Sequence, residues 1–247
     1  MGRSLILLDE CSSTNDVAAE IAEHGAPHGA VIVAETQRSG RGRHGRAWCS
    51  PRGGIWMSVL IRPNEPLPWA DSLPLTAALG IAKTLVMKWQ VKAAVRWPND
   101  VVVDGRKIAG ILVESKSKGN ELAYGTLGIG INANFDTDKL ASIRDSSTSL
   151  LVVLGTAVDR EELIAAALSD LEAMYESIRA DGEKAALQLL EDLDWSKGKN
   201  VRVRTINREL VGVFEGYESL ARARIRTRSG VERVESNIVL SVDYESD

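Results

Sequence analysis

The chain has 247 residues, of which 44% are hydrophobic and 26% charged, and its formal net charge is −4. This balance indicates a globular protein with one substantial core and room for a small second domain, and it excludes binding to DNA or membranes through bulk positive charge. The two cysteines, Cys11 and Cys49, exclude a disulfide framework. Residues 5–8 form too short an apolar run for a secretory leader, and no segment reaches the roughly 18 apolar residues of a membrane span. We therefore expect a cytoplasmic protein.

The first third of the chain predicts helices alternating with strands. Residues 12–25 ("SSTNDVAAEIAEHG") place apolar side chains at helical spacing behind a polar cap, with Gly25 as the stop. Residues 29–37 predict a strand that leads into a glycine-rich loop, and residues 53–63 predict another strand, closed by Pro63. Apolar residues at helical spacing between 75 and 89 predict the next helix.

The remainder predicts a hairpin, a strand, a long helix and a small β domain. Within residues 94–115 the dipeptide Asp104-Gly105 is a hairpin signal between two β-rich runs. Residues 121–134 predict a strand that ends in glycines, and apolar residues between 163 and 178 line one face of a helix. From residue 201 to residue 242 there are four short alternating segments: "VRVRT", "LVGVFEGY", "ARARIRT" and "VERVESNIVLSV". They predict an all-β barrel, so we place a domain boundary between residues 1–195 and 196–247.

Residues 39–46 ("SGRGRHGR") contain three arginines and three glycines, and Arg38 adds a fourth arginine. Arginine forks bind phosphates and carboxylates through paired, charge-assisted hydrogen bonds, and glycine lets the backbone close over a ligand. We therefore expect this loop, called the arginine loop below, to bind an anion. The alternatives are a solvated turn and an RNA-binding arginine–glycine arm. The loop also matches G-x-G-x-x-G, but the following "AWCSPRGG" cannot begin the helix that a dinucleotide site needs.

Three other segments supply candidate polar groups. "RWPND" (residues 96–100) ends a strand at a rigid turn, Lys107 follows the hairpin beside an apolar strand, and "GIGIN" (residues 128–132) combines glycines with an amide. The first two also have structural interpretations, an ordinary X-Pro turn and an edge charge.

The sequence contains no pattern for a histidine metal cluster, a nucleophilic serine or a phosphate-binding P-loop. In a reaction that uses the groups present, arginine and lysine bind the anions and Mg²⁺ is the candidate cofactor. Such a reaction needs no protein nucleophile. Adenylation of a carboxylic acid fits this description. The ionised acid itself attacks the α-phosphate of ATP, so the protein has to bring two anions together and spread the charge of the transition state.

Taken together, the motifs resemble the biotin–protein ligase family. The resemblance rests on "STN" (residues 13–15), "GRGRHGRAW" (40–48), "RWPND", "GRKIAGILVE" (105–114) and "GIGIN", in the family's order and spacing. It covers residues 5–135, and the C-terminal barrel more weakly. It implies an α+β fold with two parts. The first is a mixed β-sheet flanked by helices, of the class II synthetase-like type, and the second is an SH3-like barrel. It also implies that biotin and ATP form biotinyl-5′-adenylate, and that biotin is then transferred to one lysine of a biotin carboxyl carrier protein domain.

The resemblance also implies roles for individual residues. Those expected at biotin are Ser13, Thr14, Gln37, Gly40 and Arg41. Those expected at ATP and the adenylate are Arg46, Trp48, Asn99 and Asn132. Lys107 and Arg43 are expected to stabilise charge at the reacting phosphate and carboxylate. Two roles stay open for Asp100: a Mg²⁺ ligand, or the group that accepts a proton from the carrier lysine. The arginine loop is then a lid that orders over both ligands and keeps water from the reactive anhydride.

Some features depart from the family's pattern. The first residue of "RWPND" is usually lysine but is Arg96 here, and "VESNIVLSV" (residues 234–242) matches the family's ending loosely. Because "STN" begins at residue 13, we expect no N-terminal DNA-binding domain, and neither DNA nor a membrane as a partner. Family members often dimerise, so a homodimer is a further expectation. The alternatives to biotin ligation are a lipoate–protein ligase, an RNA-binding module and a purely structural protein.

Overall fold

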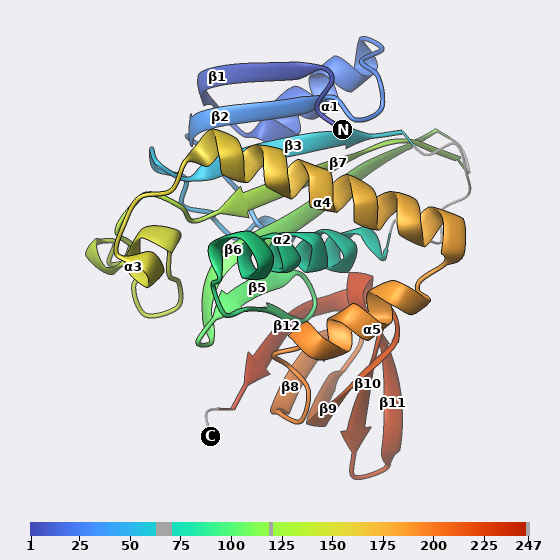
Figure 1. Cartoon of the computed structure of the whole chain (residues 1–247). Helices are drawn as coiled ribbons and strands as arrows, with labels where there is room; N and C mark the ends of the chain where they lie inside the picture. Colours follow the sequence, from blue (N-terminus) through green and yellow to red (C-terminus); the bar gives the residue numbers. More distant parts are fainter. Residues whose placement is uncertain (63–70, 119–120, 246–247) are drawn as a thin grey trace.

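The computed structural model describes residues 1–62, 71–118 and 121–245, which form two β-sheets and a set of helices (Figure 1). The strands of the first sheet are β1 (Leu5–Cys11), β2 (Val31–Gln37), β3 (Ile55–Ile61), β4 (Ala93–Arg96), β5 (Asp100–Val103), β6 (Arg106–Lys118) and β7 (Glu121–Ile131). The helices are α1 (Thr14–Glu23), α2 (Leu73–Trp89), α3 (Leu150–Leu154), α4 (Arg160–Asp181) and α5 (Lys184–Leu193). The second sheet contains β8 (Asn200–Thr205), β9 (Glu209–Ser219), β10 (Arg222–Thr227), β11 (Gly230–Glu235) and β12 (Val239–Tyr244).

The first sheet is mixed, with strand order β1-β2-β3-β7-β6-β5-β4. Only the pair β1 and β2 runs parallel among its described strands, and the other neighbours are antiparallel. Asp104 and Gly105 turn the chain from β5 into β6 with φ of 49° and 75°, the left-handed conformation that a tight hairpin needs. The α+β architecture predicted from the sequence is confirmed.

The two faces of this sheet are covered by different elements. On β3, Met57 and Val59 belong to the main core with α2 and α4, whereas Ser58 and Leu60 point to the opposite face, where α1 packs. Side chains alternate along a strand, so each strand contributes to both faces. Because both faces are covered, all seven residues of β3 are buried.

The second sheet is the small C-terminal β domain that the sequence predicts, and it lies against the β4–β5 end of the first sheet (Figure 1). Its Phe214 lies 5.7 Å from the Trp97 ring of the "RWPND" turn. The Ser196 hydroxyl accepts a hydrogen bond from Trp97 N at 3.0 Å, and the Tyr244 hydroxyl donates to Trp97 O at 2.9 Å. The predicted domain boundary after residue 195 thus falls beside the buried Ser196, which bonds to the first sheet. We keep this boundary as a proposal about organisation.

Some sequence predictions need correction. Residues 231–242 were predicted as one segment, but a 3₁₀ turn at Ser236–Ile238 divides them into β11 and β12. The break is required because β11 pairs with β10, whereas β12 pairs with β8 at the other edge of the sheet. Ser13 occupies the N-cap position of α1 but makes no side-chain cap bond. Pro63 lies outside the described residues.

Three elements, β1, α3 and α5, are absent from the sequence prediction. Among the described strands, β1 pairs with β2 alone, and its Leu5 and Leu7 are exposed. Its sequence therefore lacks the alternation of a half-buried strand. In the part of the chain that the structure describes, no helix is both long enough and apolar enough to cross a membrane.

We predict that Asp194, beside this connection, makes stability depend on pH. Its Oδ1 accepts bonds from Ser196 N at 2.8 Å and from the Tyr217 hydroxyl at 3.2 Å, while its buried Oδ2 has no partner. Burial raises its pKa to about 6. A carboxyl whose pKa is higher in the folded than in the unfolded chain binds its proton more tightly when folded. Its contribution to the free energy of unfolding is therefore present below about pH 4. It is lost as the pH rises from about 4 to about 6, and the loss is at most about 3 kcal/mol.

Urea unfolding from pH 4 to pH 7.5 measures this effect. The Asp194→Asn variant should lose that part of the pH dependence, whereas Asp192→Asn, at an exposed position of α5, should keep it. An unchanged pH dependence in Asp194→Asn would show that the carboxyl titrates alike in the folded and unfolded chains.

Candidate active site

A cavity of about 890 Å³ lies over the face of the first sheet that is turned away from α2, and the arginine loop and β12 contribute to its walls. Eleven of the twelve residues predicted for the site line it: Ser13, Thr14, Gln37, Arg41, Arg43, Arg46, Trp48, Asn99, Asp100, Lys107 and Asn132. Gly40 is the exception, because it lies behind the wall, where a Cβ would approach Ser50 Oγ to 2.5 Å and Trp48 O to 2.6 Å. Segments more than 100 residues apart in sequence therefore meet in one place.

The floor of the cavity is made by glycines that allow Trp48 to lie on the sheet. A Cβ at Gly130 would come within 2.7 Å of Trp48 Nε1, closer than real Cβ atoms approach other atoms. Leu127, Ile129 and Ile131 alternate with these glycines on β7 and belong to the main core. The "GIGIN" pattern thus places apolar side chains on one face and bare backbone on the other.

Asp100 and Lys107 form the charged centre of the cavity. Lys107 Nζ lies 2.6 Å from Asp100 Oδ1 and 4.7 Å from the centre of the Trp48 ring. Burial by itself raises the pKa of Asp100, but the charges of Lys107 and Arg96 outweigh that effect, so its pKa lies below the ordinary value. Asp100 is therefore an ionised acceptor that holds the Lys107 ammonium in place.

Arg96, the residue that departs from the family's lysine, makes three contacts. Its Nη2 lies 3.0 Å from Asp100 Oδ2, its Nη1 donates to Gly105 O at 3.2 Å, and its guanidinium carbon lies 5.7 Å from the centre of the Trp195 ring. A planar guanidinium can serve all three partners at once, whereas a lysine ammonium is a single point charge. The substitution keeps the charge beside Asp100 and connects it to the domain junction.

The tip of the arginine loop is held by main-chain carbonyls of the C-terminal domain. Arg43 Nη2 donates to Ser236 O and to Val239 O, both at 2.7 Å, and Arg46 Nη2 donates to Leu240 O at 3.1 Å. Burial lowers the pKa of Arg43 below its ordinary value, although a guanidinium stays protonated in proteins. These neutral acceptors leave the loop's charge uncompensated, so the tip attracts anions.

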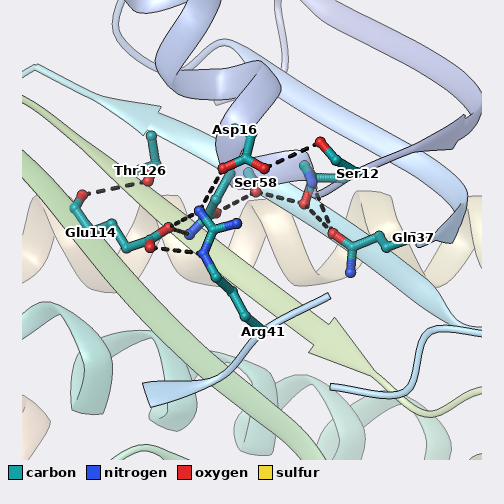
Figure 2. Close-up of polar contacts among 9 residues, drawn as sticks. Ser12, Asp16, Gln37, Arg41, Ser58, Glu114 and Thr126 are labelled. Atoms are coloured by element: carbon teal, nitrogen blue, oxygen red, sulfur yellow. Dashed lines mark hydrogen bonds and ion pairs between the residues drawn. The ribbon is translucent and has the colours of Figure 1, made fainter. Parts of the chain in front are cut away.

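Three of the residues predicted for the biotin head group, Ser13, Thr14 and Gln37, line the cavity at its α1 end. Figure 2 shows the contacts of Gln37 there. Gln37 Oε1 accepts bonds from Thr14 N at 2.8 Å and from Thr14 Oγ1 at 3.2 Å, and Gln37 Nε2 donates to Ser50 Oγ at 2.8 Å. Ser58 Oγ lies 2.7 Å from Thr14 Oγ1. This end offers hydroxyl and amide groups, suited to a neutral polar ring.

Two predicted amides have structural partners. Asn99 Nδ2 donates to Ile111 O at 2.7 Å, and buried Asn132 Nδ2 donates to Thr148 O at 2.9 Å and to Lys107 O at 3.3 Å. Asn99 Oδ1 accepts from Arg43 Nη1 at 3.5 Å. Both amides thus brace the backbone around Lys107, in addition to lining the cavity.

Sequence reasoning missed the acidic partners of Arg41. The Arg41 guanidinium is bound by Glu114 on β6 and by Asp16 on α1, so the structure does not present it as an uncompensated charge (Figure 2). The signal available in the sequence was Glu114 itself, a single acid at the end of the apolar run "IAGILV". Without the fold, nothing connects it to an arginine 73 residues earlier.

A Mg²⁺ ion that arrives with its own phosphate ligands would meet the carboxylate of Asp100 at the charged centre of the cavity. Among residues 1–62, 71–118 and 121–245 there is no group of three His, Cys, Asp or Glu side chains that could hold a metal. Asp100 places one carboxylate beside Lys107. Mg²⁺ in nucleotide sites is commonly held by one or two carboxylates together with phosphates and water, so Asp100 would contribute to such a site through an oxygen that already contacts Lys107 or Arg96.

Comparison with known proteins agrees with this geometry. A model of the family described as "Biotin/lipoate A/B protein ligase family" matches residues 7–132. The chain belongs to that family. It is 34% identical to a bifunctional ligase/repressor BirA of Bacillus spizizenii over 96% of the chain and 73% of that protein. It is 31% identical to a biotin–[acetyl-CoA-carboxylase] ligase of Paracoccus denitrificans over 91% of the chain and 95% of that protein.

A solved structure resembles the whole chain of this biotin/lipoate ligase family member. The structure is a biotin protein ligase from Aquifex aeolicus in complex with biotin and ATP, which superposes with a TM-score of 0.86. It is 27% identical, and the match covers 98% of this chain and all of that one. The similarity extends over both sheets, so the C-terminal domain belongs to the common architecture.

We predict that Gly130→Ala displaces Trp48 from the floor and lowers the free energy of unfolding by about 1–3 kcal/mol, because the added methyl group has no space. Gly125→Ala is the matched control on the same strand, since its Cβ would meet Glu114 O at an ordinary 3.7 Å. Urea unfolding of both variants tests this. Equal stability of the two variants would contradict the close packing of Trp48 on Gly130.

Proposed function

We propose that this chain is an ATP-dependent ligase that activates biotin as biotinyl-5′-adenylate and transfers it to a lysine of a biotin carboxyl carrier protein. The observation that carries the proposal is one cavity lined by two contact clusters. Arg43 and Lys107 gather around Asp100, and Thr14 pairs with Gln37. A ligand with a neutral polar ring and an anionic tail fits that division. Family membership and the relatives named above support the same substrate pair.

The first step joins two anions. A carboxylate oxygen of biotin forms a bond to the α-phosphorus of ATP, the bond from that phosphorus to the bridging oxygen breaks, and pyrophosphate leaves. Lys107 and Arg43 offset the charge that gathers at the reacting phosphate and carboxylate. Arg46, Trp48, Asn99 and Asn132 are the proposed nucleotide-side residues. Ser13, Thr14 and Gln37 are the proposed biotin-side residues, with Arg41 at their border. Gly40 is proposed to act behind the cavity wall, where the close approach of Ser50 and Trp48 leaves no room for a side chain.

In the second step a neutral lysine amine of the carrier attacks the acyl carbon. The acyl–oxygen bond breaks, and AMP leaves with the proton that the amine nitrogen loses. Asp100 was left with two roles, and its lowered pKa favours one of them. A carboxylate that holds its charge beside Lys107 and Arg96 is a weak proton acceptor. We therefore propose Asp100 as the anion that orients Lys107 and as a candidate ligand of Mg²⁺. That ion would supply charge neutralisation at the phosphates.

The second candidate function is lipoate ligation, because the family includes lipoate ligases by its own description. Pyrophosphate exchange into ATP separates the two, measured with biotin, with lipoate and without an acid. Exchange that depends on biotin supports the proposal, and exchange that depends on lipoate alone contradicts it. We also propose a cytoplasmic location. A homodimer is a further proposal, in which two copies would meet at the edge strand β1 with its exposed Leu5 and Leu7.

We predict that Lys107→Ala lowers biotin-dependent pyrophosphate exchange by about 100-fold or more, because its charge acts on the transition state more than on bound biotin. Biotin affinity, measured by calorimetry, should change little. Lys92→Ala, at an exposed position, is the control. A normal exchange rate in Lys107→Ala would remove Lys107 from the mechanism.

A second prediction concerns retention of the intermediate. Arg43→Gly removes the loop cation that Ser236 and Val239 carbonyls hold, so the adenylate should escape into solution more readily. Lysines of an added bystander protein should then be biotinylated, detected by a streptavidin blot, while exchange activity persists. Bystander labelling no greater than with the unaltered protein would contradict the role of the loop as a lid.

A further inference from the structure

A cluster of charged and polar side chains holds the base of the arginine loop. Arg41 Nε lies 3.0 Å from Glu114 Oε1, and Arg41 Nη2 lies 2.9 Å from Glu114 Oε2. The same Nη2 lies 2.6 Å from Asp16 Oδ1 (Figure 2). Two parallel N–H···O bonds between a guanidinium and a carboxylate are the strongest and most directional form of this ion pair.

Glu114 is itself fixed by buried groups. Its Oε2 accepts a bond from Asn15 Nδ2 at 2.7 Å, and Asn15 Oδ1 accepts from Ser58 Oγ at 2.6 Å. Asn15 is 3% exposed and Ser58 is fully buried. Asn15 also packs closely on the sheet, because a Cβ at Gly128 would meet its Oδ1 at 2.6 Å. The acid therefore presents a rigid acceptor to the loop rather than a mobile surface charge.

The charge balance separates Arg41 from the other cations of the cavity. One guanidinium faces the two carboxylates of Glu114 and Asp16, which leaves a net charge of −1 at the base of the loop. The Asp16 hydrogen bond and then Glu114 raise the pKa of Arg41 above its ordinary value. An anionic ligand is repelled from such a group and attracted to the tip of the loop. Arg41 is thus poorly suited to bind a carboxylate or phosphate.

We propose that Glu114, with Asp16, is a positioning residue that clasps Arg41 and so anchors the base of the arginine loop. The loop is then held at two points. Its base is fixed to β6 and α1 through Arg41, and its tip, with Arg43, lies on the carbonyls of the C-terminal domain. Between them Gly42 N donates to Arg46 O at 2.7 Å. Arg41 is a structural cation, and Arg43 is the cation that meets the ligand's anionic end.

The proposal rests on the proposed function only for its catalytic consequence. With the base fixed, little of the binding energy of biotin is spent on ordering the loop. Releasing the base should therefore raise the KM for biotin in pyrophosphate exchange by about tenfold and leave kcat within about twofold.

Hydrogen exchange of the ligand-free protein tests the clasp without any assumption about activity. In Glu114→Gln, amides of residues 40–48 should exchange about five- to tenfold faster, because the loop opens more often. The thermal midpoint should change little, since the loop contributes little to the core. The control is Glu23→Gln, which breaks the comparable pair of Glu23 with Lys116 (2.8 Å), another contact between α1 and β6.

A double variant shows whether Glu114 acts through Arg41. Hydrogen exchange of the loop amides in the double variant, Arg41→Met with Glu114→Gln, should be no faster than in Arg41→Met alone. Each of three results would overturn the clasp. Hydrogen exchange of the loop could be unchanged in Glu114→Gln, it could be accelerated equally in Glu23→Gln, or the effects could add in the double variant. Suppose that loop amides exchange hydrogen faster in Glu114→Gln, but that the unaltered protein shows no biotin-dependent pyrophosphate exchange. That pair of results would support the clasp and refute the proposed function.

Discussion

The bare face of the large sheet is the constraint on which the site depends. On β6 and β7, glycines replace side chains on the face turned away from α2, while the alternate positions supply the apolar core beneath. The indole of Trp48 and the side chain of Asn15 can therefore lie directly on backbone. The arginine loop and the start of α1 are both fixed by this contact, and they in turn define the two ends of the cavity.

Electrostatics divides that cavity. At one end Asp100 is surrounded by Lys107 and Arg96, with Arg43 nearby, so three cations face one carboxylate. At the other end two carboxylates face Arg41. Solvent partly screens the charges of Asp16 and Glu114, which are each more than a third exposed, whereas the more buried Asp100 is screened less. Sequence reasoning grouped all the loop arginines as anion binders, and the structure separates them by their partners.

The C-terminal domain takes part in the same arrangement. Its carbonyls at Ser236, Val239 and Leu240 hold the tip of the arginine loop, and its Tyr244 hydroxyl holds the backbone of Trp97 beside Asn99 and Asp100. A domain whose sequence matches the family's ending only loosely contributes main-chain acceptors, which do not depend on side-chain identity. This explains why a weak sequence match is compatible with a close structural one.

The sequence by itself determined most of the regular elements and the types of residue that line the cavity. Local signals sufficed for these: the helical spacing of α2 and α4, the Asp104-Gly105 hairpin, and the arginines, lysine and amides that line the cavity. Only the tertiary structure decided the partners. The edge strand β1 has no local pattern, because six of its seven residues are exposed or half-buried and Cys11 alone is buried. The contact of Glu114 with Arg41 spans 73 residues and exists because β6 and the loop meet on one face of the sheet. Residue type fixes which charges are present, but the compensation of each charge is a long-range property of the fold.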